Sequence, residues 1–443
     1  MNLSIDPTTL TDTLDKLGAA NRRFMANYPG EPAGRQPVHS VYGGAHLYRA
    51  ETTQKLGELS LSHLNRYAPD AAEFARALGI DSKLADAVYS RTIAKLQREA
   101  VEDFRIDFED GYGNRPDAEE DATAVSAAKE VAKAHREGII SPFIGIRVKT
   151  MTDELKRRSV RTMDLFVSTL LDELGGLPNN FVITLPKIVI PEQVTASVDL
   201  LSAIEHKRGL PNGTLKIEMM IEATQAILGA DGRSPLPLML QAANGRCTGA
   251  HLGTYDFTAS ANITAMYQGM EHSACDFAKY MMTMAYASTG IFLSDGATNV
   301  MPIGPHTGEL SAAQEAENRE VVHSVWRTVY RNNRHSLKNG YFQGWDLHPG
   351  HLSIRYAACY SFFLEGLDAA SARLSNFIRH AAQATRVGEV FDDAATGQGL
   401  LNYFLRAYNC GAITLEEIEA TGLTREEIHG RSFVKILANR RKL

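Results

Sequence analysis

Five short apolar stretches recur at nearly constant spacing along the chain, and each ends in a charged residue. They are Phe104–Asp110, Pro142–Lys149, Phe181–Lys187, Lys216–Glu222 and Ala250–Asp256. Their starts lie 38, 39, 35 and 34 residues apart, which is about the length of one strand, one helix and two short loops. An evenly repeated βα unit with functional side chains at the carboxyl ends of its strands predicts a (β/α)8 TIM barrel.

Three further stretches complete a set of eight expected strands: Val38–Gly44, Gly290–Leu293 and Gly340–Leu347. The chain between the first and second strands is long enough for two helices, expected around residues 46–67 and 70–100. We interpret this length as an insertion in the first repeat. Helical patterns occupy the intervals between the later strands. These expected helices are Asp117–Glu137, Ser159–Leu174, Glu192–Lys207, Ser234–Ala243 and Ser273–Thr289.

Helical segments are expected before and after the barrel in the sequence. Residues 1–37 form an N-terminal arm, with a helix over residues 8–28 in which leucines recur at three- and four-residue steps. The barrel is expected over residues 38–352, and residues 353–443 form a C-terminal helical extension. Its last two helices are short and acidic, and each begins with a threonine in an N-cap pattern. These threonines are Thr414 and Thr424.

The composition limits the classes of function. A net charge of −6 gives no support to nucleic-acid binding, which usually requires a basic patch. The four cysteines are scattered without a CxxC pair, so neither a zinc site nor a disulfide framework is indicated, and a reduced, cytoplasmic location fits best. The start of the chain lacks the basic and apolar regions of a secretory signal, so such a signal is not expected. The sequence contains no apolar run of about 18 residues, so a membrane span is not expected either.

Glu222 and Asp256 are the strongest candidates for metal ligands. Each ends an expected strand, and neighbouring strands lie about 4.8 Å apart. Two carboxylates at that separation, at the open end of a barrel, can share one Mg²⁺ or Mn²⁺, with substrate oxygens and water completing the coordination. The alternative interpretation is a pair of solvated loop acids that happen to follow strands.

A second acidic cluster follows the second expected strand. Asp107 and Glu109 share one face of an extended strand and should point into the barrel mouth, while Asp110 lies at a glycine turn. Arg147 and Lys149 on the next strand can neutralise these acids. The cluster either orients metal-bound water or forms a structural network of salt bridges, and Asp107 is also a candidate for contact with substrate.

Three basic side chains are candidates for substrate recognition and catalysis. Arg147 keeps its charge, so it can bind a carboxylate through two hydrogen bonds and stabilise charge on an oxo group; the alternative is a salt bridge at the rim. Lys187 either shares this task or caps the rim. His348 follows the eighth strand and is a candidate general acid or base, because the ordinary pKa of histidine is near 6.5; a structural role in a loop is the alternative.

Six segments occur in order over about residues 38–350: DFEDGYG, IRVK, LPKI, MMIEAT, GTYDFT and GWDLHP. In this series the chain resembles the citrate lyase beta-subunit-like family, also called the HpcH/HpaI aldolase family, a branch of the phosphoenolpyruvate/pyruvate superfamily of barrels. The segment GTYDF is also similar to a segment of the malate synthases. Three positions depart from the family pattern: Lys149, Tyr255 and Trp345.

The resemblance implies that Glu222 and Asp256 are Mg²⁺ ligands, that Arg147 holds a 2-oxo acid or its enolate, and that Glu109 and Asp110 lie near the metal. The implied reaction forms or cleaves a carbon–carbon bond of a small 2-oxo or hydroxy acid, as the free acid or a coenzyme A thioester. The resemblance also implies a homo-oligomer. Phosphoenolpyruvate or phosphoryl-transfer chemistry on the same barrel, and a non-catalytic metal-binding scaffold, are the alternatives.

Overall fold

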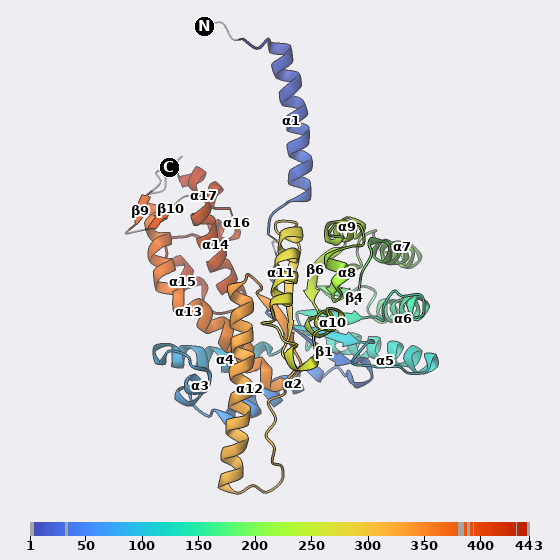
Figure 1. Ribbon diagram of the computed structural model, residues 1–443, viewed down its shortest axis with the longest axis vertical. Coiled ribbons are helices and arrows are strands. Elements are labelled where there is room, and N and C mark those ends of the chain that lie inside the picture. Colours follow the sequence, from blue (N-terminus) through green and yellow to red (C-terminus); the bar gives the residue numbers. More distant parts are fainter. Residues whose placement is uncertain are drawn as a thin grey trace.

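The computed structural model describes residues 4–31, 34–379, 385–387, 390–392, 394–430 and 432–440. Its centre is a closed barrel of eight parallel strands, in which each strand pairs with the next and β8 pairs with β1 (Figure 1). The predicted TIM barrel is confirmed. The strands are β1 (His39–Gly44), β2 (Asp103–Asp107), β3 (Phe143–Arg147), β4 (Phe181–Leu185), β5 (Lys216–Ile221), β6 (Cys247–Leu252), β7 (Phe292–Ala297) and β8 (Gln343–Asp346).

The strands are buried along most of their length because both faces are covered, by helices outside and by side chains inside the barrel. All five residues of β4, for example, are buried. The parallel register places Asp107 beside Arg147, and Arg147 beside Thr184 on the following strand. This register brings the carboxyl ends of successive strands, and the charged residues on them, to one rim of the barrel.

Helices follow the strands around the outside of the barrel. The predicted helices correspond to α5, α6, α7, α9 and α11, with ends that differ by a few residues. The sequence did not predict α12, a long and polar helix whose buried positions nevertheless recur at three- and four-residue steps. These helices are α5 (Asp117–Arg136), α6 (Lys156–Leu174), α7 (Pro191–Arg208), α8 (Thr224–Ile227), α9 (Leu236–Ala242), α10 (Thr254–Ser260), α11 (Ser273–Tyr286), α12 (Ala312–Lys338) and α13 (Pro349–Arg379).

The insertion after β1 contains three α-helices instead of the predicted two: α2 (Thr52–Tyr67), α3 (Ala71–Leu78) and α4 (Ala85–Glu99). The prediction of a single helix over residues 70–100 is therefore wrong. The helix breaks at Gly79, whose φ of 73° is left-handed and ends α3, as glycine often does at a helix C-terminus.

The C-terminal extension continues directly from the barrel. The expected boundary between residues 352 and 353 falls inside α13, which packs against α12, α2 and α4 before it enters the extension. The capping threonines are confirmed, because Thr414 Oγ1 accepts a hydrogen bond from the Glu417 N–H and Thr424 Oγ1 accepts one from Glu427. The elements are β9 (Thr385–Val387), β10 (Val390–Asp392), α14 (Ala394–Asn409), α15 (Leu415–Glu419), α16 (Arg425–Gly430) and α17 (Phe433–Arg440).

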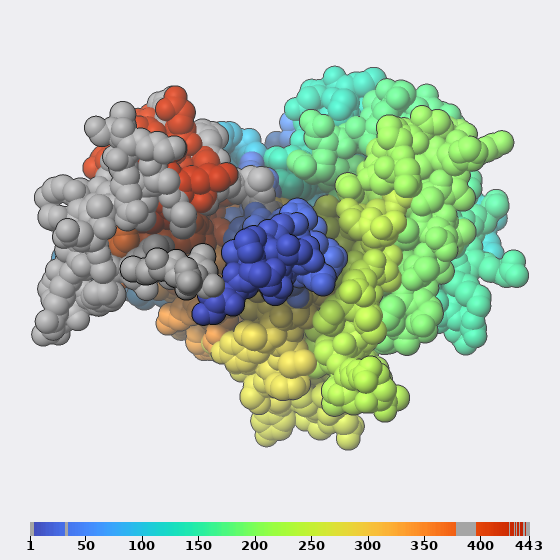
Figure 2. Space-filling model, turned by 90° about the horizontal axis from the view of Figure 1, so that it is seen from above, coloured from blue at the N-terminus to red at the C-terminus, as the bar shows by residue number. Residues whose placement is uncertain are grey.

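The predicted N-terminal helix is α1 (Pro7–Asn27), and it projects away from the rest of the molecule (Figure 1). Seen from above, α1 points toward the viewer from the middle of the surface (Figure 2). Its base is attached near the amino-terminal end of β7, where the Gly30 N–H donates a hydrogen bond to the Ser288 carbonyl oxygen at 2.9 Å. Among the described residues, none of the helices combines the length and apolar character needed to cross a membrane.

Candidate active site

The carboxyl ends of β2 to β5 bring four of the predicted site residues to one rim. Asp107 and Arg147 are the last residues of β2 and β3, Lys187 follows β4 by two residues, and Glu222 follows β5 directly. Asp256 reaches the cluster from the first turn of α10. The expectation that Asp256 ends a strand is therefore wrong, because β6 stops at Leu252 and the chain turns into a helix.

Asp107 holds Arg147 in a fixed orientation. Arg147 Nε and Nη2 donate to the two Asp107 carboxylate oxygens at 2.7 and 2.5 Å. The backbone N–H groups of Glu109 and Gly111 donate to the same two oxygens at 2.9 and 2.7 Å. Because both oxygens are occupied, this geometry favours a positioning role for Asp107 over the substrate contact that the sequence suggested.

The guanidinium of Arg147 also rests on an aromatic ring that the sequence analysis missed. Its Cζ lies 4.9 Å from the centre of the Tyr42 ring on β1, a cation–π distance. Its remaining nitrogen, Nη1, lies 3.1 Å from Glu109 Oε2 and 3.4 Å from Asp110 Oδ2. The sequence contains one indication of this contact. Tyr42 lies two residues before the glycine that ends β1, and alternate residues of a strand share a face, so Tyr42 is expected on the same face as the end of the strand.

Lys187 lies among the carboxylates. Its Nζ is 2.5 Å from Glu109 Oε1, 3.2 Å from Asp110 Oδ1 and 3.7 Å from Asp256 Oδ2. Its backbone N–H donates to Glu222 Oε2 at 2.9 Å. This lysine has a φ of 51°, a left-handed conformation that is uncommon for a residue with a side chain. One residue therefore contacts four acids, from three different segments of the rim.

Glu222 is almost fully buried, with 3% of its surface exposed. Burial raises the pKa of Glu222 to about 8; the nearby Glu109 and Asp256 contribute to this rise, against the opposing effect of Arg147. Gly253 makes room for the side chain, because a Cβ atom on Gly253 would lie 2.3 Å from Glu222 Cγ. Gly253 directly follows β6 and was not among the predicted site residues.

Glu109 and Asp110 are adjacent acids with opposite tendencies. Burial and the charge of Asp110 raise the pKa of Glu109, despite its contacts with Arg147 and Lys187. Burial also opposes ionisation of Asp110, but the positive charges of Arg147 and Lys187 lower its pKa overall. Two carboxyl groups whose environments move their pKa values apart can divide proton transfer and charge stabilisation between them.

The donor set fits a hard divalent cation. Five carboxylates face two bases, Arg147 and Lys187, so the fully ionised cluster carries three surplus negative charges. Mg²⁺ binds one or two carboxylates together with water and substrate oxygens. Within the described part of the chain, no three His, Cys, Asp or Glu side chains are already arranged as a set of metal ligands. The carboxylates are Asp107, Glu109, Asp110, Glu222 and Asp256.

A cation between Glu222 and Asp256 requires the Lys187 ammonium to move, because it now lies beside Asp256 and Glu109. Lysine side chains are flexible, and 30% of the Lys187 side chain is exposed, so this movement is sterically simple. Its backbone N–H keeps its hydrogen bond to Glu222 when only the side chain moves.

The structure groups His348 with two other histidines. Its ring centre lies 5.9 Å from that of His63 and 6.0 Å from that of His351. Burial and the charges of these two neighbours lower the pKa of His348 to about 4, so it is neutral at pH 7. Together with Tyr42 and Leu352 it lines a mainly apolar cavity of about 220 Å³. The acid–base role of His348 stays a prediction.

A buried polar network forms the floor of the barrel below the rim. Arg105 Nε lies 2.7 Å from Asp103 Oδ1, and its Nη2 lies 2.8 Å from Glu218 Oε2. Glu218 Oε2 is also 2.6 Å from His251 Nε2, and His251 Nδ1 accepts a hydrogen bond from the Trp345 indole at 3.1 Å. Each of these charges has a partner inside the barrel, so the network is structural and supports the acid cluster from below.

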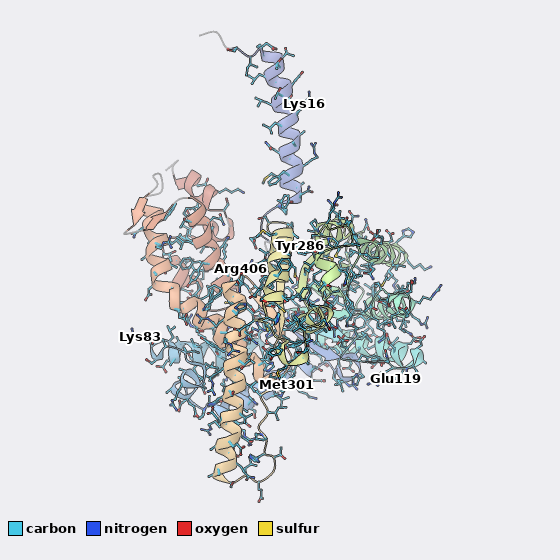
Figure 3. The ribbon with its side chains drawn as sticks, in the orientation of Figure 1. Lys16, Lys83, Glu119, Tyr286, Met301 and Arg406 are labelled. Atoms are coloured by element: carbon cyan, nitrogen blue, oxygen red, sulfur yellow. The ribbon has the colours of Figure 1, made fainter. Side chains whose placement is uncertain are left out.

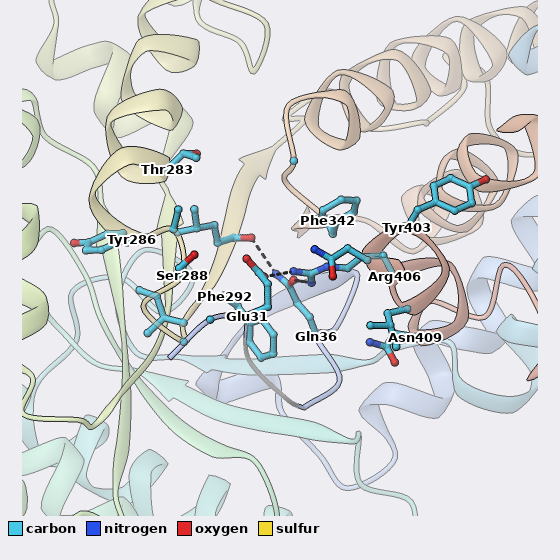
Figure 4. A pocket seen from close by; sticks show the side chains of 18 of the residues that line it. Glu31, Gln36, Thr283, Tyr286, Ser288, Phe292, Phe342, Tyr403, Arg406 and Asn409 are labelled. Atoms are coloured by element: carbon cyan, nitrogen blue, oxygen red, sulfur yellow. Dashed lines mark hydrogen bonds and ion pairs between the residues drawn. The ribbon is translucent and has the colours of Figure 1, made fainter. Parts of the chain in front are cut away.

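A larger cavity of about 460 Å³ lies near the amino-terminal ends of β7 and β8, beside the C-terminal extension (Figure 4). Arg406 enters it from α14, where Glu31 and Gln36 bind its guanidinium and the ring of Phe342 lies 4.8 Å from its Cζ. Figure 3 shows Arg406 on the extension and Tyr286 on the side of the barrel. The lining is mainly apolar and amide groups, in contrast to the acid cluster at the other rim.

Comparison with known proteins identifies the family. A family model described as a domain of unknown function (DUF6986) matches residues 17–436. The chain belongs to the DUF6986 family. A comparison with curated proteins found no match. The match of the DUF6986 model extends from within α1 to within α17, so the family includes most of the N-terminal arm and the C-terminal extension as well as the barrel.

A search of solved structures found distant similarities to this DUF6986 protein. A citrate lyase from Burkholderia xenovorans LB400 has a TM-score of 0.55 at 16% identity, over 88% of this chain and 97% of that chain. The protein CitE from Mycobacterium tuberculosis, in complex with magnesium, acetoacetate and coenzyme A, has a TM-score of 0.48 at 12% identity, over 85% and 99%. A Haloferax volcanii malate synthase magnesium/glyoxylate complex gives 0.47 at 14%, over 90% and 97%. At 16% identity, the similarity to the Burkholderia citrate lyase shows a common fold only.

Proposed function

We propose that this DUF6986 protein is a Mg²⁺-dependent carbon–carbon lyase or aldolase that acts on a small 2-oxo or hydroxy acid through its enolate. The observation that carries the proposal is the buried carboxyl of Glu222 at the barrel rim, which burial and neighbouring acids push toward its protonated form. A bound divalent cation would keep Glu222 ionised, and Asp256 is the second ligand. The order of the six strand-end segments in the sequence supports the choice of reaction.

The fixed side chains of the rim have distinct roles in this proposal. Arg147 is aligned by Asp107 and Tyr42, so its Nη1, which now faces Glu109 and Asp110, binds the substrate carboxylate in their place without losing conformational freedom at that moment. The Lys187 ammonium supplies positive charge near the oxygen on which charge develops. When bound, the metal would polarise the oxo group as a Lewis acid. Glu109, whose pKa is raised, accepts the proton that is removed next to the oxo group.

The substrate form is part of the proposal. The rim offers one aligned guanidinium and one flexible ammonium, which suit a substrate with a single carboxylate beside an oxo or hydroxy group. The neighbouring apolar cavity lined by Tyr42, Tyr48 and Leu352 offers room for a short hydrocarbon substituent. Free acids and a coenzyme A thioester are therefore both to be tested.

Exchange of protons for deuterium tests enolate formation directly. The protein is incubated in D₂O with pyruvate, oxaloacetate or acetyl-CoA, with Mg²⁺ or with EDTA, and the protons next to the carbonyl group are followed by NMR. We expect Mg²⁺-dependent exchange with at least one of them, above the protein-free rate, and its loss in Glu222→Gln. Glu119→Gln, which neutralises an exposed acid on α5, is the matched control and should leave exchange unchanged.

Two outcomes would contradict the proposal. Exchange that persists in EDTA and in Glu222→Gln would exclude a metal-stabilised enolate. Absence of exchange with all three compounds, together with Mg²⁺ binding, would favour the phosphoenolpyruvate chemistry or the binding scaffold that the sequence left as alternatives.

A further inference from the structure

The N-terminal helix α1 has a regular seam of residues that nothing covers in the single chain. Its members alternate steps of four and three residues, the 3.5-residue repeat of a coiled coil. Leucines, a phenylalanine and a tyrosine on this seam are each more than 40% exposed. The seam consists of Leu10, Leu14, Leu17, Asn21 and Phe24, and Tyr28, the C-cap residue directly after α1, continues its spacing.

The positions that flank the seam are uncharged and mostly small. In the heptad pattern they would lie beside the seam of a partner helix, where charged residues usually select partners. All five charged residues of α1 lie on the opposite face, at Asp12, Asp15, Lys16, Arg22 and Arg23. The uncharged flanking residues are Thr11, Thr13, Gly18, Ala20, Met25 and Asn27.

The helix needs a partner for energetic reasons. Asp6 caps it by accepting a hydrogen bond from the Thr9 N–H, and Pro7 occupies its first turn, so the sequence specifies a helix start. However, none of the residues of α1 is buried, and most of the stability of a protein helix comes from burial of its apolar face. The view with side chains shows α1, marked by Lys16, standing clear of the body (Figure 3).

We propose that α1 pairs in parallel with α1 of a second copy of this chain, as a short coiled coil that makes the protein a dimer. Asn21 favours a second copy as the partner and a parallel orientation of the two helices. In a parallel pair Asn21 faces Asn21, and the two amides can hydrogen-bond across the seam. In an antiparallel pair it would face a leucine or Phe24, or lie outside the overlap, and an amide buried against an apolar side chain is left unpaired.

The charges of α1 argue against the other occupants of such a face. A foreign coiled-coil partner is usually selected by charges beside the seam, and none are present there. A helix that lies on an anionic membrane is usually rich in lysine and arginine on its polar face, whereas this face carries two acids and three bases. A second copy needs no charge complementarity, because in a parallel pair each seam residue faces the same residue of the other copy.

Exposed apolar side chains also lie on α11, close to the base of the arm. On α11, Phe277, Tyr280 and Met284 are exposed at steps of three and four residues, and the chain after α11 holds the arm through the Ser288 hydrogen bond to Gly30. A parallel pair brings the two bodies to the same end of the coil, so these stripes lie near the new interface. The arm leaves from the amino-terminal ends of the strands, and therefore pairing leaves the acid cluster at the opposite rim open.

Sedimentation equilibrium of the full chain tests the pairing. We expect wild type to have twice the mass of the 48.6 kDa chain. Leu17→Asp should weaken association by at least roughly 100-fold, since each of two copies loses a buried leucine. Lys16→Asp introduces the same side chain one residue earlier, on the outer face, and should change the dissociation constant by less than about threefold. Both positions are exposed in the single chain, so both variants should keep the wild-type unfolding transition.

Cross-linking tests the direction. Leu17→Cys should form a disulfide between two copies on oxidation and Lys16→Cys should not, because only the seam residue faces its own counterpart in a parallel pair. The four native cysteines are buried and do not compete. A single-chain mass at every concentration, or a dimer that is equally tight in Leu17→Asp, would overturn the proposal. Failure of Leu17→Cys to cross-link, or a monomer that instead sediments with anionic vesicles through α1, would overturn it as well.

Discussion

Replacing Glu222 by glutamine tests whether the acid cluster is built for a cation. In the metal-free protein we expect Glu222→Gln to be more stable than wild type at neutral and alkaline pH. Glutamine has nearly the same shape and can still accept the hydrogen bond from the Lys187 N–H, but it has no charge to lose or gain. A gain in stability from removal of a rim acid would be the mark of a site whose usual ligand is absent.

The expected gain follows from the pKa of Glu222, which burial raises from 4.5 to about 8. Between these two values the folded protein holds one proton more than the unfolded chain, so the free energy of unfolding of wild type falls as pH rises. Each pKa unit corresponds to about 1.4 kcal/mol. The difference between variant and wild type should therefore grow from about pH 4.5, and reach at most about 5 kcal/mol above about pH 8.

Urea unfolding with EDTA and with excess Mg²⁺, from about pH 5 to about pH 9, measures this difference. Mg²⁺ should stabilise wild type, because it binds the folded state alone, and should have little effect on Glu222→Gln. Asp256→Asn is the matched control. Its carboxylate is 45% exposed, so in EDTA its loss should change stability by less than about 0.5 kcal/mol, while the effect of Mg²⁺ is again lost.

Two results would refute this reasoning. A stability difference between Glu222→Gln and wild type that stays constant over the pH range would mean that the pKa of Glu222 is not raised by folding. A Mg²⁺ effect of wild-type size in both Glu222→Gln and Asp256→Asn would mean that these acids do not bind the cation.

Three further substitutions test the supporting structure. Asp107→Asn leaves the buried Arg147 without its main charge partner and should lower the free energy of unfolding by about 3 kcal/mol in urea; a loss below about 1 kcal/mol would contradict the pairing. Gly253→Ala places a Cβ against Glu222 and should destabilise by about 1–3 kcal/mol and weaken Mg²⁺ binding by calorimetry. Thr414→Ala removes an N-cap and should cost about 1 kcal/mol, seen as faster hydrogen exchange in α15.

The fold could be predicted well because the βα period is a local property of the chain. Each strand–helix unit has a typical length, and charged residues at the ends of five of the expected strands fix the period, so eight strands could be counted from the sequence. The errors arose where a local pattern was ambiguous. The buried stripe of α12 includes asparagine, histidine and serine residues, so its apolar period is weak, and the break at Gly79 divides a stretch that was predicted as one helix.

The candidate site was less accessible to sequence reasoning. Arg147, Lys187 and Glu222 could be named because they lie at or near the carboxyl ends of expected strands. That Asp107 uses both oxygens to orient Arg147, and that Tyr42 lies against the guanidinium, depends on contacts between strands far apart in the chain. The grouping of His348 with His63 and His351 depends on such contacts as well.

The order of residues along the chain was enough to specify the barrel, the rim on which the charges gather and the helical arm with its seam, because hydrophobic period, turn residues and caps act between near neighbours. The protonation tendency of Glu222, the division of roles between Glu109 and Asp110, and the position of Lys187 among four acids emerged only in three dimensions. These properties depend on burial and on charge–charge distances, and both are set when distant segments pack together.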